Sequence, residues 1–562
     1  MRSVDKAARA PEGAFKKALG KTMKRVFLAA VALAAIGLID RVDAADAGCR
    51  KGGDPYKNYA CVEPYLGTDF LTRLINYYRL EWGHESAPAD PKAPPGRRAE
   101  SEVPPTPQSI PPMPFTEWPY GGTTNLGVTR PSSVDSPLMA ALGNTAVGHG
   151  LNDNHIQIYG WIDPGGNLST STVRGGNNPA AYSYNPNNIQ LDQAVLYIER
   201  LPDTVQKDNI DWGFRVAPIY GENYRYTTAY GLFSSQLLNQ NLNNGWDIPM
   251  AYGEIFIPQV MDGLILRLGR YISIPDIEAQ LAPNNYMYSH SMTYTYDNYT
   301  NTGLEATLAL NKNWILQAGL TAGTEALPWH LGATIANPFP NPLFPGNTMP
   351  KDPGAQPSVT TGVRWTSDSG NDDLNVVANA INHGQWGYNN LQWYGLTYYH
   401  KFNDQWHLAF ETYNEHQNNV LNANNPIAVA ALNAGGTPFS PQYMPFNAPG
   451  LAYCSSAVLY SCTATFQTFL TYVNYKITPL DNISYRAEFV NDEQGQRTGT
   501  KTRYVETGIG WQHWFSPQIE MRPEVTYYRS LDAFAFNGNS NLGIAPNRNY
   551  AIIGAADIII HF

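Results

Sequence analysis

The sequence has little cysteine, little charge and few long apolar runs. Only 4 of its 562 residues are Cys, and Asp, Glu, Lys and Arg together make up 15% of the chain, against roughly 25% in average soluble proteins. The formal net charge is −10, which disfavours a nucleic acid as a partner. The CxxC or His spacings that hold zinc are missing, so we expect no metal and no cofactor.

The single long apolar run lies near the start, from Val26 to Ile39, directly after Lys24 and Arg25. It is too short for a membrane-spanning helix, which needs about 20 residues. A positive start, an apolar centre and small residues up to Ala44 are typical of a secretory signal peptide. We therefore expect 1–44 to be a signal peptide, extended before Met23 by an upstream start codon, and the mature chain to be exported.

The cysteines form two local pairs, and an even count in an exported chain predicts the disulfides Cys49–Cys61 and Cys454–Cys462. The first pair lies in a small periplasmic segment, 45–85, which also carries apolar residues at helical spacing from Phe70 to Tyr78. Many prolines in 86–119 predict an extended linker. The remaining residues, 120–562, are expected to form one domain.

That domain is rich in segments that alternate between apolar and polar residues. "QWHLAFETYNE" (405–415) and "NISYRAEFV" (482–490) both follow a period of two, which is the period of a β-strand. The last segment, "YAIIGAADIIIHF", keeps this pattern up to Phe562. Aromatic residues near strand ends predict interfacial girdles. These residues are Trp393, Trp406, Trp511, Trp514, Tyr527 and Tyr528.

The connections between the expected strands decide the fold. Short turns such as "NKN" and "NDQ" alternate with long gaps, which are 163–189, 220–250, 272–299, 324–357, 416–462 and 530–549. A transmembrane barrel of the bacterial outer membrane has short periplasmic turns and long external loops. We therefore predict an all-β fold, a closed antiparallel transmembrane β-barrel of about 16 strands, with 14 or 18 as alternatives. The last strand should pair with the first, since a free strand edge in lipid is costly.

Several long segments resemble a β-barrel porin family described as OmpL-like. The similar stretches include "LRLGRYISIPDIEAQLAPNNYMYSHSMTYTYDNYTNTG" (266–303), "DWGFRVAPIYGENYRYTTAYG" (211–231) and "QLDQAVLYIERLPD" (190–203), and the resemblance covers about 119–562. It implies a passive pore in the outer membrane and supplies no substrate. The terminal Phe562 is similar to the final aromatic residue by which the barrel-insertion machinery recognises outer-membrane proteins.

We expect the barrel to be a porin, a water-filled channel for passive diffusion of small hydrophilic solutes or ions, because about 16 strands leave an aqueous lumen. Its expected partners are outer-membrane lipid, the insertion machinery and the permeating solutes, and a homo-oligomer is possible. The predicted pore-lining residues are Asp211, Glu254, Glu305, Glu411, Arg486, Glu488, Glu506, Glu520, Arg522 and Glu524.

The third long loop, 272–299, is the predicted constriction, since the third loop folds inward in the general porins that this barrel resembles. Pro275 and Pro283 bracket "DIEAQLA", which is able to form one or two helical turns. Asp276 and Glu278 would then face wall arginines and produce a weak preference for cations. The expected arginines are Arg215, Arg267 and Arg364. An external loop is the alternative.

Other functions are weighed against the porin. A lipase or protease barrel needs a nucleophile and a base in register, and GxSxG, HExxH and SxxK are all missing from the sequence. His400 and His407 on neighbouring strands are more simply explained as structural. An energy-coupled receptor has about 22 strands and a folded plug, for which 48–84 is too short. A structural or adhesive barrel stays open as an alternative.

Overall fold

The computed structural model describes residues 65–80 and 136–562, with short internal stretches left out of the description. These stretches are 181, 205, 230–231, 239, 273–276, 329–333, 337–347, 351–354, 385–389, 404, 434–450, 479–480, 517 and 540–541. The described residues fall into two units, a small helical one and a barrel. None of the described helices is both long and apolar enough to cross a membrane.

The helical unit contains α3 (Phe70–Leu80), α4 (Pro137–Leu142) and α5 (Ala146–Asp153). Helix α3 lies where the apolar spacing predicts a helix. The buried Arg73 joins α3 to α4, since its Nε and Nη2 donate to the carbonyl oxygen of Ala140 at 3.0 and 2.7 Å. Thr145 caps α5 by accepting a hydrogen bond from the Gly148 N–H at 3.0 Å. Residues 45–64, with Cys49 and Cys61, lie outside the described residues.

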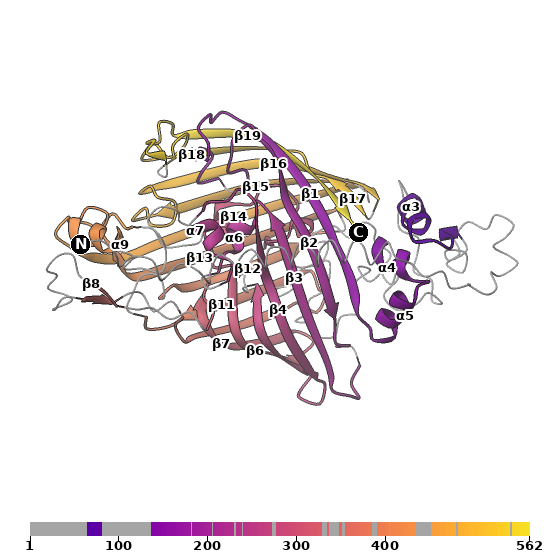
Figure 1. Cartoon of the computed structure of the whole chain (residues 1–562). Helices are drawn as coiled ribbons and strands as arrows, with labels where there is room; N and C mark the ends of the chain where they lie inside the picture. The colour runs from indigo at the N-terminus through magenta and orange to yellow at the C-terminus, as the bar shows by residue number, and fades with distance from the viewer. Residues whose placement is uncertain are drawn as a thin grey trace, which may run out of the picture. The chain divides into compact units, whose positions relative to one another are not determined.

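The barrel is one antiparallel sheet that closes on itself (Figure 1). Its strands are β1 (Gln157–Ser169), β2 (Ile189–Arg200), β3 (Asp211–Gly221), β4 (Gly245–Ile257), β5 (Gly263–Ile272), β6 (Thr300–Asn311), β7 (Trp314–Thr324), β10 (Ser358–Thr366), β11 (Asp372–Ile381), β12 (Gln392–Lys401), β13 (Trp406–Leu421), β14 (Ser461–Thr478), β15 (Asp481–Asp492), β16 (Thr502–Ser516), β17 (Ile519–Met521), β18 (Glu524–Ser530) and β19 (Tyr550–His561). The first strand begins at Gln157, and the helices α4 and α5 precede it.

The predicted sixteen-strand barrel is confirmed. Strands β17 and β18 both pair with β16 and β19, so they occupy a single place in the barrel. They are separated at Arg522 and Pro523, and a proline cannot donate a backbone hydrogen bond to a neighbouring strand. Every strand of the barrel pairs with its neighbour in the chain, apart from this break and the closure.

The closure of the barrel involves the last residue of the chain. Strand β19 lies beside β1 (Figure 1). Trp161 is opposite His561 in this pairing. The Phe562 N–H donates to the Gly160 carbonyl oxygen at 2.8 Å, and the Gly160 N–H donates back at 3.0 Å. The terminal strand pattern is therefore explained by its pairing, which leaves no free edge at this seam.

The outer face of the barrel is apolar. On β19, Ile552, Ile558 and Ile560 are 37 to 43% exposed, whereas Ile553 and Ile559 between them are buried. An apolar outer band is what lipid requires of a barrel strand. Exposed tryptophans lie near the short-turn ends of β3, β7, β13 and β16, as a girdle requires, and they are Trp212, Trp314, Trp406 and Trp511.

The girdle prediction is wrong for three residues. Trp393, Trp514 and Tyr528 are at most 2% exposed and lie on the inner face. Trp393 packs on Tyr413 there, with ring centroids 5.2 Å apart. Because neighbouring strand residues point to opposite faces, nearness to a strand end does not place an aromatic side chain at the lipid interface.

The long loops carry the remaining short elements. These are α6 (Tyr224–Thr227), α7 (Ser235–Leu238), η4 (Ala282–Asn284), α8 (Met292–Thr295), α9 (Pro426–Asn433) and the small pair β8 (Thr334–Ala336) and β9 (Thr348–Pro350). The predicted disulfide Cys454–Cys462 is confirmed, with its Cα atoms 5.9 Å apart. It joins the end of the long loop after β13 to the start of β14.

Candidate functional site: a loop across the barrel lumen

The described part of the loop between β5 and β6, residues 277–299, lies inside the barrel; we call it the crossing loop. From Ile277 to Tyr299 its described side chains are buried, apart from that of Ala279, which is half-buried. The side chain of Asn284 is not described. Connecting loops normally run over the surface of a protein. This loop instead buries its apolar and tyrosine side chains among those of the barrel wall.

The crossing loop reaches the opposite side of the barrel. Strand β15 is eight places from β5 around the sheet, which is half of the circumference. The backbone N–H groups of Met292 and Thr293 donate to the Glu488 carboxylate on β15, at 2.8 and 2.9 Å. The Thr293 hydroxyl donates to the same carboxylate at 2.9 Å. The loop therefore spans the full width of the lumen.

Two more wall carboxylates accept hydrogen bonds from the backbone of the crossing loop. Glu411 on β13 accepts from the Ile277 N–H at 2.9 Å. Glu524 on β18 accepts from the Ser289 N–H at 3.1 Å, and from the Ser289 hydroxyl. An ionised carboxylate only accepts hydrogen bonds, so these side chains match the otherwise unsatisfied amide groups of a loop in the lumen.

Glu278 links the two arms of the crossing loop to the wall. Its carboxylate accepts from the Ser291 N–H at 3.1 Å and from the Tyr472 hydroxyl, and it lies 3.4 Å from Arg486. Arg486 also pairs with Glu506 at 2.5 Å and donates to the Ser289 carbonyl oxygen at 2.7 Å. Glu278 is therefore brought together with Arg486 on β15.

The three arginines predicted to face the loop carboxylates lie on β3, β5 and β10. Arg215 pairs with Glu199 at 2.6 Å. Arg267 lies 3.3 Å from Glu254 and 3.6 Å from Glu305, and Arg364 pairs with Asp373 at 2.6 Å. The described contacts of Glu278 include none of these three. Asp276, the other predicted constriction residue, lies outside the described residues.

The predicted helical turn in "DIEAQLA" is wrong for Ile277 to Leu281, which bend without a helix, and only the last residue, Ala282, is helical. The helical pieces follow it, as η4 from Ala282 and α8 from Met292. Helix α8 is capped by the Ser291 hydroxyl, which accepts from the Tyr294 N–H at 3.0 Å. Side chains of the wall satisfy part of the backbone of the loop, and its own sequence does not reveal these partners.

Strand β2 and the strand formed by β17 and β18 hold the other arm of the loop. Gln193 donates to the Gln280 carbonyl oxygen at 2.9 Å and accepts from the Ala282 N–H at 3.1 Å. Arg522 pairs with Asp557 and donates to the Asn285 carbonyl oxygen at 3.0 Å. Gln193 was not predicted because the candidate lining residues were chosen among charged residues only. In addition, "QLDQAVLYIER" carries apolar residues on both faces, so its inward face is not evident from the sequence.

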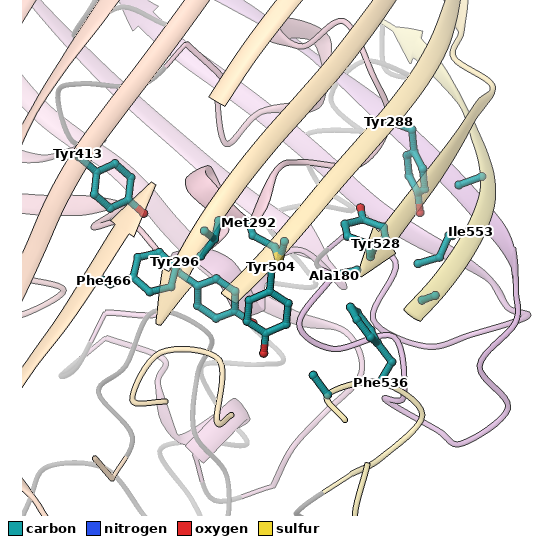
Figure 2. Packing of buried hydrophobic residues seen from close by; sticks show 14 of the residues in the cluster. Ala180, Tyr288, Met292, Tyr296, Tyr413, Phe466, Tyr504, Tyr528, Phe536 and Ile553 are labelled. Carbon is teal, nitrogen blue, oxygen red and sulfur yellow. The ribbon is translucent and has the colours of Figure 1, made fainter. Parts of the chain in front are cut away.

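Aromatic stacking joins the crossing loop to the first and second long loops. The Tyr182 ring lies 4.0 Å from that of Tyr226 and 3.7 Å from that of His290, measured between centroids. Further toward β14, the Tyr296 ring is 5.7 Å from that of Phe466. Figure 2 shows Met292 and Tyr296 of the loop among wall residues such as Phe466, Tyr504 and Tyr528. Met292 and Tyr296 therefore belong to one buried hydrophobic cluster with these residues of the wall.

The predicted pore-lining charges are mostly buried in this structure. Apart from Asp211, these side chains are between 0 and 6% exposed. Asp211 lies at the short-turn end of β3 and pairs with Arg200 at 2.8 Å. Glu520 accepts from Gln512 Nε2 at 2.6 Å. Most of these charges therefore face a protein group, and their pairing limits the field that a passing ion would meet.

Two buried carboxylates lie just outside the strands at the long-loop end. Glu325 follows β7 and accepts from the backbone N–H of Thr300 at 2.8 Å, where the crossing loop ends. Burial raises the pKa of Glu325 to about 8. Burial likewise raises the pKa of Glu222, after β3, to about 7, although Arg225 lies 3.4 Å away.

A closed antiparallel barrel with an apolar outer face, charged inner positions, short turns at one end and long loops at the other defines a bacterial outer-membrane β-barrel. The family model described as "Putative beta-barrel porin-2, OmpL-like" matches residues 155–562. The chain belongs to this family of porins, and it resides in the bacterial outer membrane. No curated relative matches the sequence.

Solved bacterial porins are similar in fold at low identity. An anion-selective porin from Comamonas acidovorans is 8% identical, and the match covers 72% of this chain and 99% of that one with a TM-score of 0.41. The outer-membrane channel DcaP of Acinetobacter baumannii is 10% identical, with 72 and 97% coverage and a TM-score of 0.41. OmpT of Vibrio cholerae is 8% identical, with 72 and 97% coverage and a TM-score of 0.37.

Proposed function

We propose that this protein forms a narrow water-filled channel for the passive diffusion of small hydrophilic solutes or ions. A barrel of about 16 strands encloses an aqueous lumen unless something fills it. The observation that carries the proposal is the crossing loop, which lies across this lumen from β5 to Glu488 on β15. A loop in this position restricts the channel to small permeants.

A weak preference for cations accompanies this function, because the predicted lining residues contain more carboxylates than guanidinium groups. Asp276 and Glu278 remain the proposed constriction carboxylates. Replacing them together, Asp276→Asn with Glu278→Gln, should shift the reversal potential in a salt gradient toward anions. If both the selectivity and the conductance stay as in the unmodified protein, these residues do not form the constriction.

Single-channel recording in planar bilayers tests the function directly. The refolded barrel should insert and conduct in discrete steps, and vesicles that contain it should swell in small sugars more than in large ones. Detergent alone and the heat-unfolded chain serve as controls. A correctly folded barrel that inserts without conducting would overturn the proposal and favour a structural or adhesive barrel.

Assembly adds a second proposal, that the insertion machinery recognises Phe562 and that several copies associate in the membrane. Deleting Phe562 should lower the amount of folded barrel in the outer membrane, and chemical cross-linking of membranes should give a ladder that ends at the oligomer. Equal amounts of folded barrel with and without Phe562 would contradict the first part. A cross-linking pattern that stops at the monomer would contradict the second.

A further inference from the structure

We propose that Glu488 and Glu524 are positioning residues, which set the width of the channel by holding the crossing loop, and that they do not act as an ion filter. This inference rests on the proposed channel function. Both residues are among the predicted pore-lining carboxylates. Under this inference they hold the loop, and the permeating ion does not meet their charge.

The hydrogen-bonding partners of the two carboxylates support this role. Glu488 accepts from two successive N–H groups and one hydroxyl, and Glu524 accepts from the N–H and the hydroxyl of Ser289. The two residues are 6 and 5% exposed, so little of either carboxylate is left for a hydrated ion.

The contacts between these two carboxylates and the loop are concentrated on one short stretch of chain, Ser289 to Thr293. This stretch lies on the far side of the lumen from the strands that carry the loop, β5 and β6. Tyr413 adds a bond there, since its hydroxyl donates to the Thr293 carbonyl oxygen at 2.6 Å. Without the carboxylate bonds, this stretch keeps fewer attachments at the far wall, among them those of Tyr413 to Thr293 and of Arg486 to Ser289, and we expect it to shift within the lumen.

The structure also offers a way to fix the loop without the carboxylates. Met287 of the loop lies over Gly510 on β16, and a Cβ atom added at Gly510 would be 2.8 Å from the Met287 Cγ. In a disulfide the Cβ of one cysteine is about 3 Å from the sulfur of the other. The pair Met287→Cys with Gly510→Cys should therefore close a disulfide when the loop is in the described position.

The first experiment measures the position of the loop without using conductance. The Met287→Cys/Gly510→Cys pair should oxidise nearly completely in the folded barrel, and at least about fivefold more slowly when Glu488→Gln and Glu524→Gln are added. Glu305→Gln is the matched control, because Glu305 is a buried wall carboxylate that pairs with Arg267 and has no described contact with the loop. An oxidation rate that is equal in all three backgrounds would overturn the proposal.

The second experiment separates width from selectivity. Glu488→Gln with Glu524→Gln should raise the single-channel conductance by roughly twofold or more and leave the reversal potential in a salt gradient unchanged. Oxidising the cysteine pair in this background should return the conductance to its original value, and reducing it should raise it again. The unmodified protein under the same reductant controls for loss of Cys454–Cys462.

An unchanged conductance with a shifted reversal potential would show that the two carboxylates act as a filter, and it would overturn the proposal. A barrel that never conducts would refute the proposed function instead. The oxidation rates would still decide in that case whether Glu488 and Glu524 hold the loop.

Discussion

The two halves of the lumen wall use the same kinds of residue in different ways. On β13 to β19, the carboxylates of Glu411, Glu488 and Glu524 and the guanidinium groups of Arg486 and Arg522 bind the crossing loop. On β2 to β11, most of the described inward charges form ion pairs between neighbouring strands, as Arg215 does with Glu199 and Arg364 with Asp373.

This difference teaches that an inward position does not define the role of a charge in a barrel. Its role depends on the group that it contacts, which is either the crossing loop or a charge on a neighbouring strand. A carboxylate that faces loop amides holds the loop, whereas one that faces a neighbouring arginine stabilises the wall.

The largest difference is expected between Arg486 and Arg364. Arg486→Met leaves Glu506 and Glu278 without a cationic partner in a buried site, and removal of one member of a buried pair costs about 3–5 kcal/mol. Arg364→Met leaves only one carboxylate of the wall, Asp373, without its arginine. Urea unfolding in detergent should therefore show the larger loss of stability for Arg486→Met.

The comparison breaks if Arg364→Met is the more destabilising of the two substitutions. It also breaks if Arg486→Met leaves the Met287→Cys/Gly510→Cys pair as reactive as before. In both cases Arg486 would stabilise the wall, as Arg364 does, and would not hold the crossing loop.

A change of pH tests the role of the buried carboxylate Glu325, which lies where the crossing loop ends. Because burial raises the pKa of Glu325 to about 8, the folded barrel binds a proton there that the unfolded chain releases above about 4.5. The contribution of this group to stability is fully present below about pH 4.5 and is lost as the pH rises through about 8. It amounts to roughly 5 kcal/mol over this whole range, of which roughly 3 kcal/mol is lost above pH 6.

The thermal midpoint in detergent should accordingly fall between pH 6 and pH 9, and Glu325→Gln should reduce that fall. Glu222 has its pKa raised to about 7, so Glu222→Gln should remove a further part of it. A pH dependence that is the same in the unmodified protein and in both variants would contradict the assignment.

The smallest effect is expected from the disulfide. Cys454 and Cys462 are 8 residues apart in the sequence, and closing so short a loop stabilises it by roughly 2–3 kcal/mol. Cys454→Ser with Cys462→Ser should speed proteolysis of the loop before β14, while the heat-induced gel shift of the barrel stays nearly unchanged. A large loss of barrel stability would place this loop among the structural parts of the wall.

The sequence alone determined the strands, the barrel class and the Cys454–Cys462 bond, for a local reason. Strand alternation has a period of two, so a few neighbouring residues show which side chains face lipid, and loop lengths show the end at which each turn lies. The same locality explains the error at Trp393 and Trp514, since a shift of one residue moves a side chain to the other face.

Only the tertiary structure decided what the inward charges do. Thr293 and Glu488 are 195 residues apart in the sequence, and Ser289 and Glu524 are 235 apart. Their meeting depends on the closure of the whole sheet and on the entry of the loop into the lumen. A buried amide is bound by whichever acceptor the assembled wall presents to it, and that acceptor lies on strands far away in the chain.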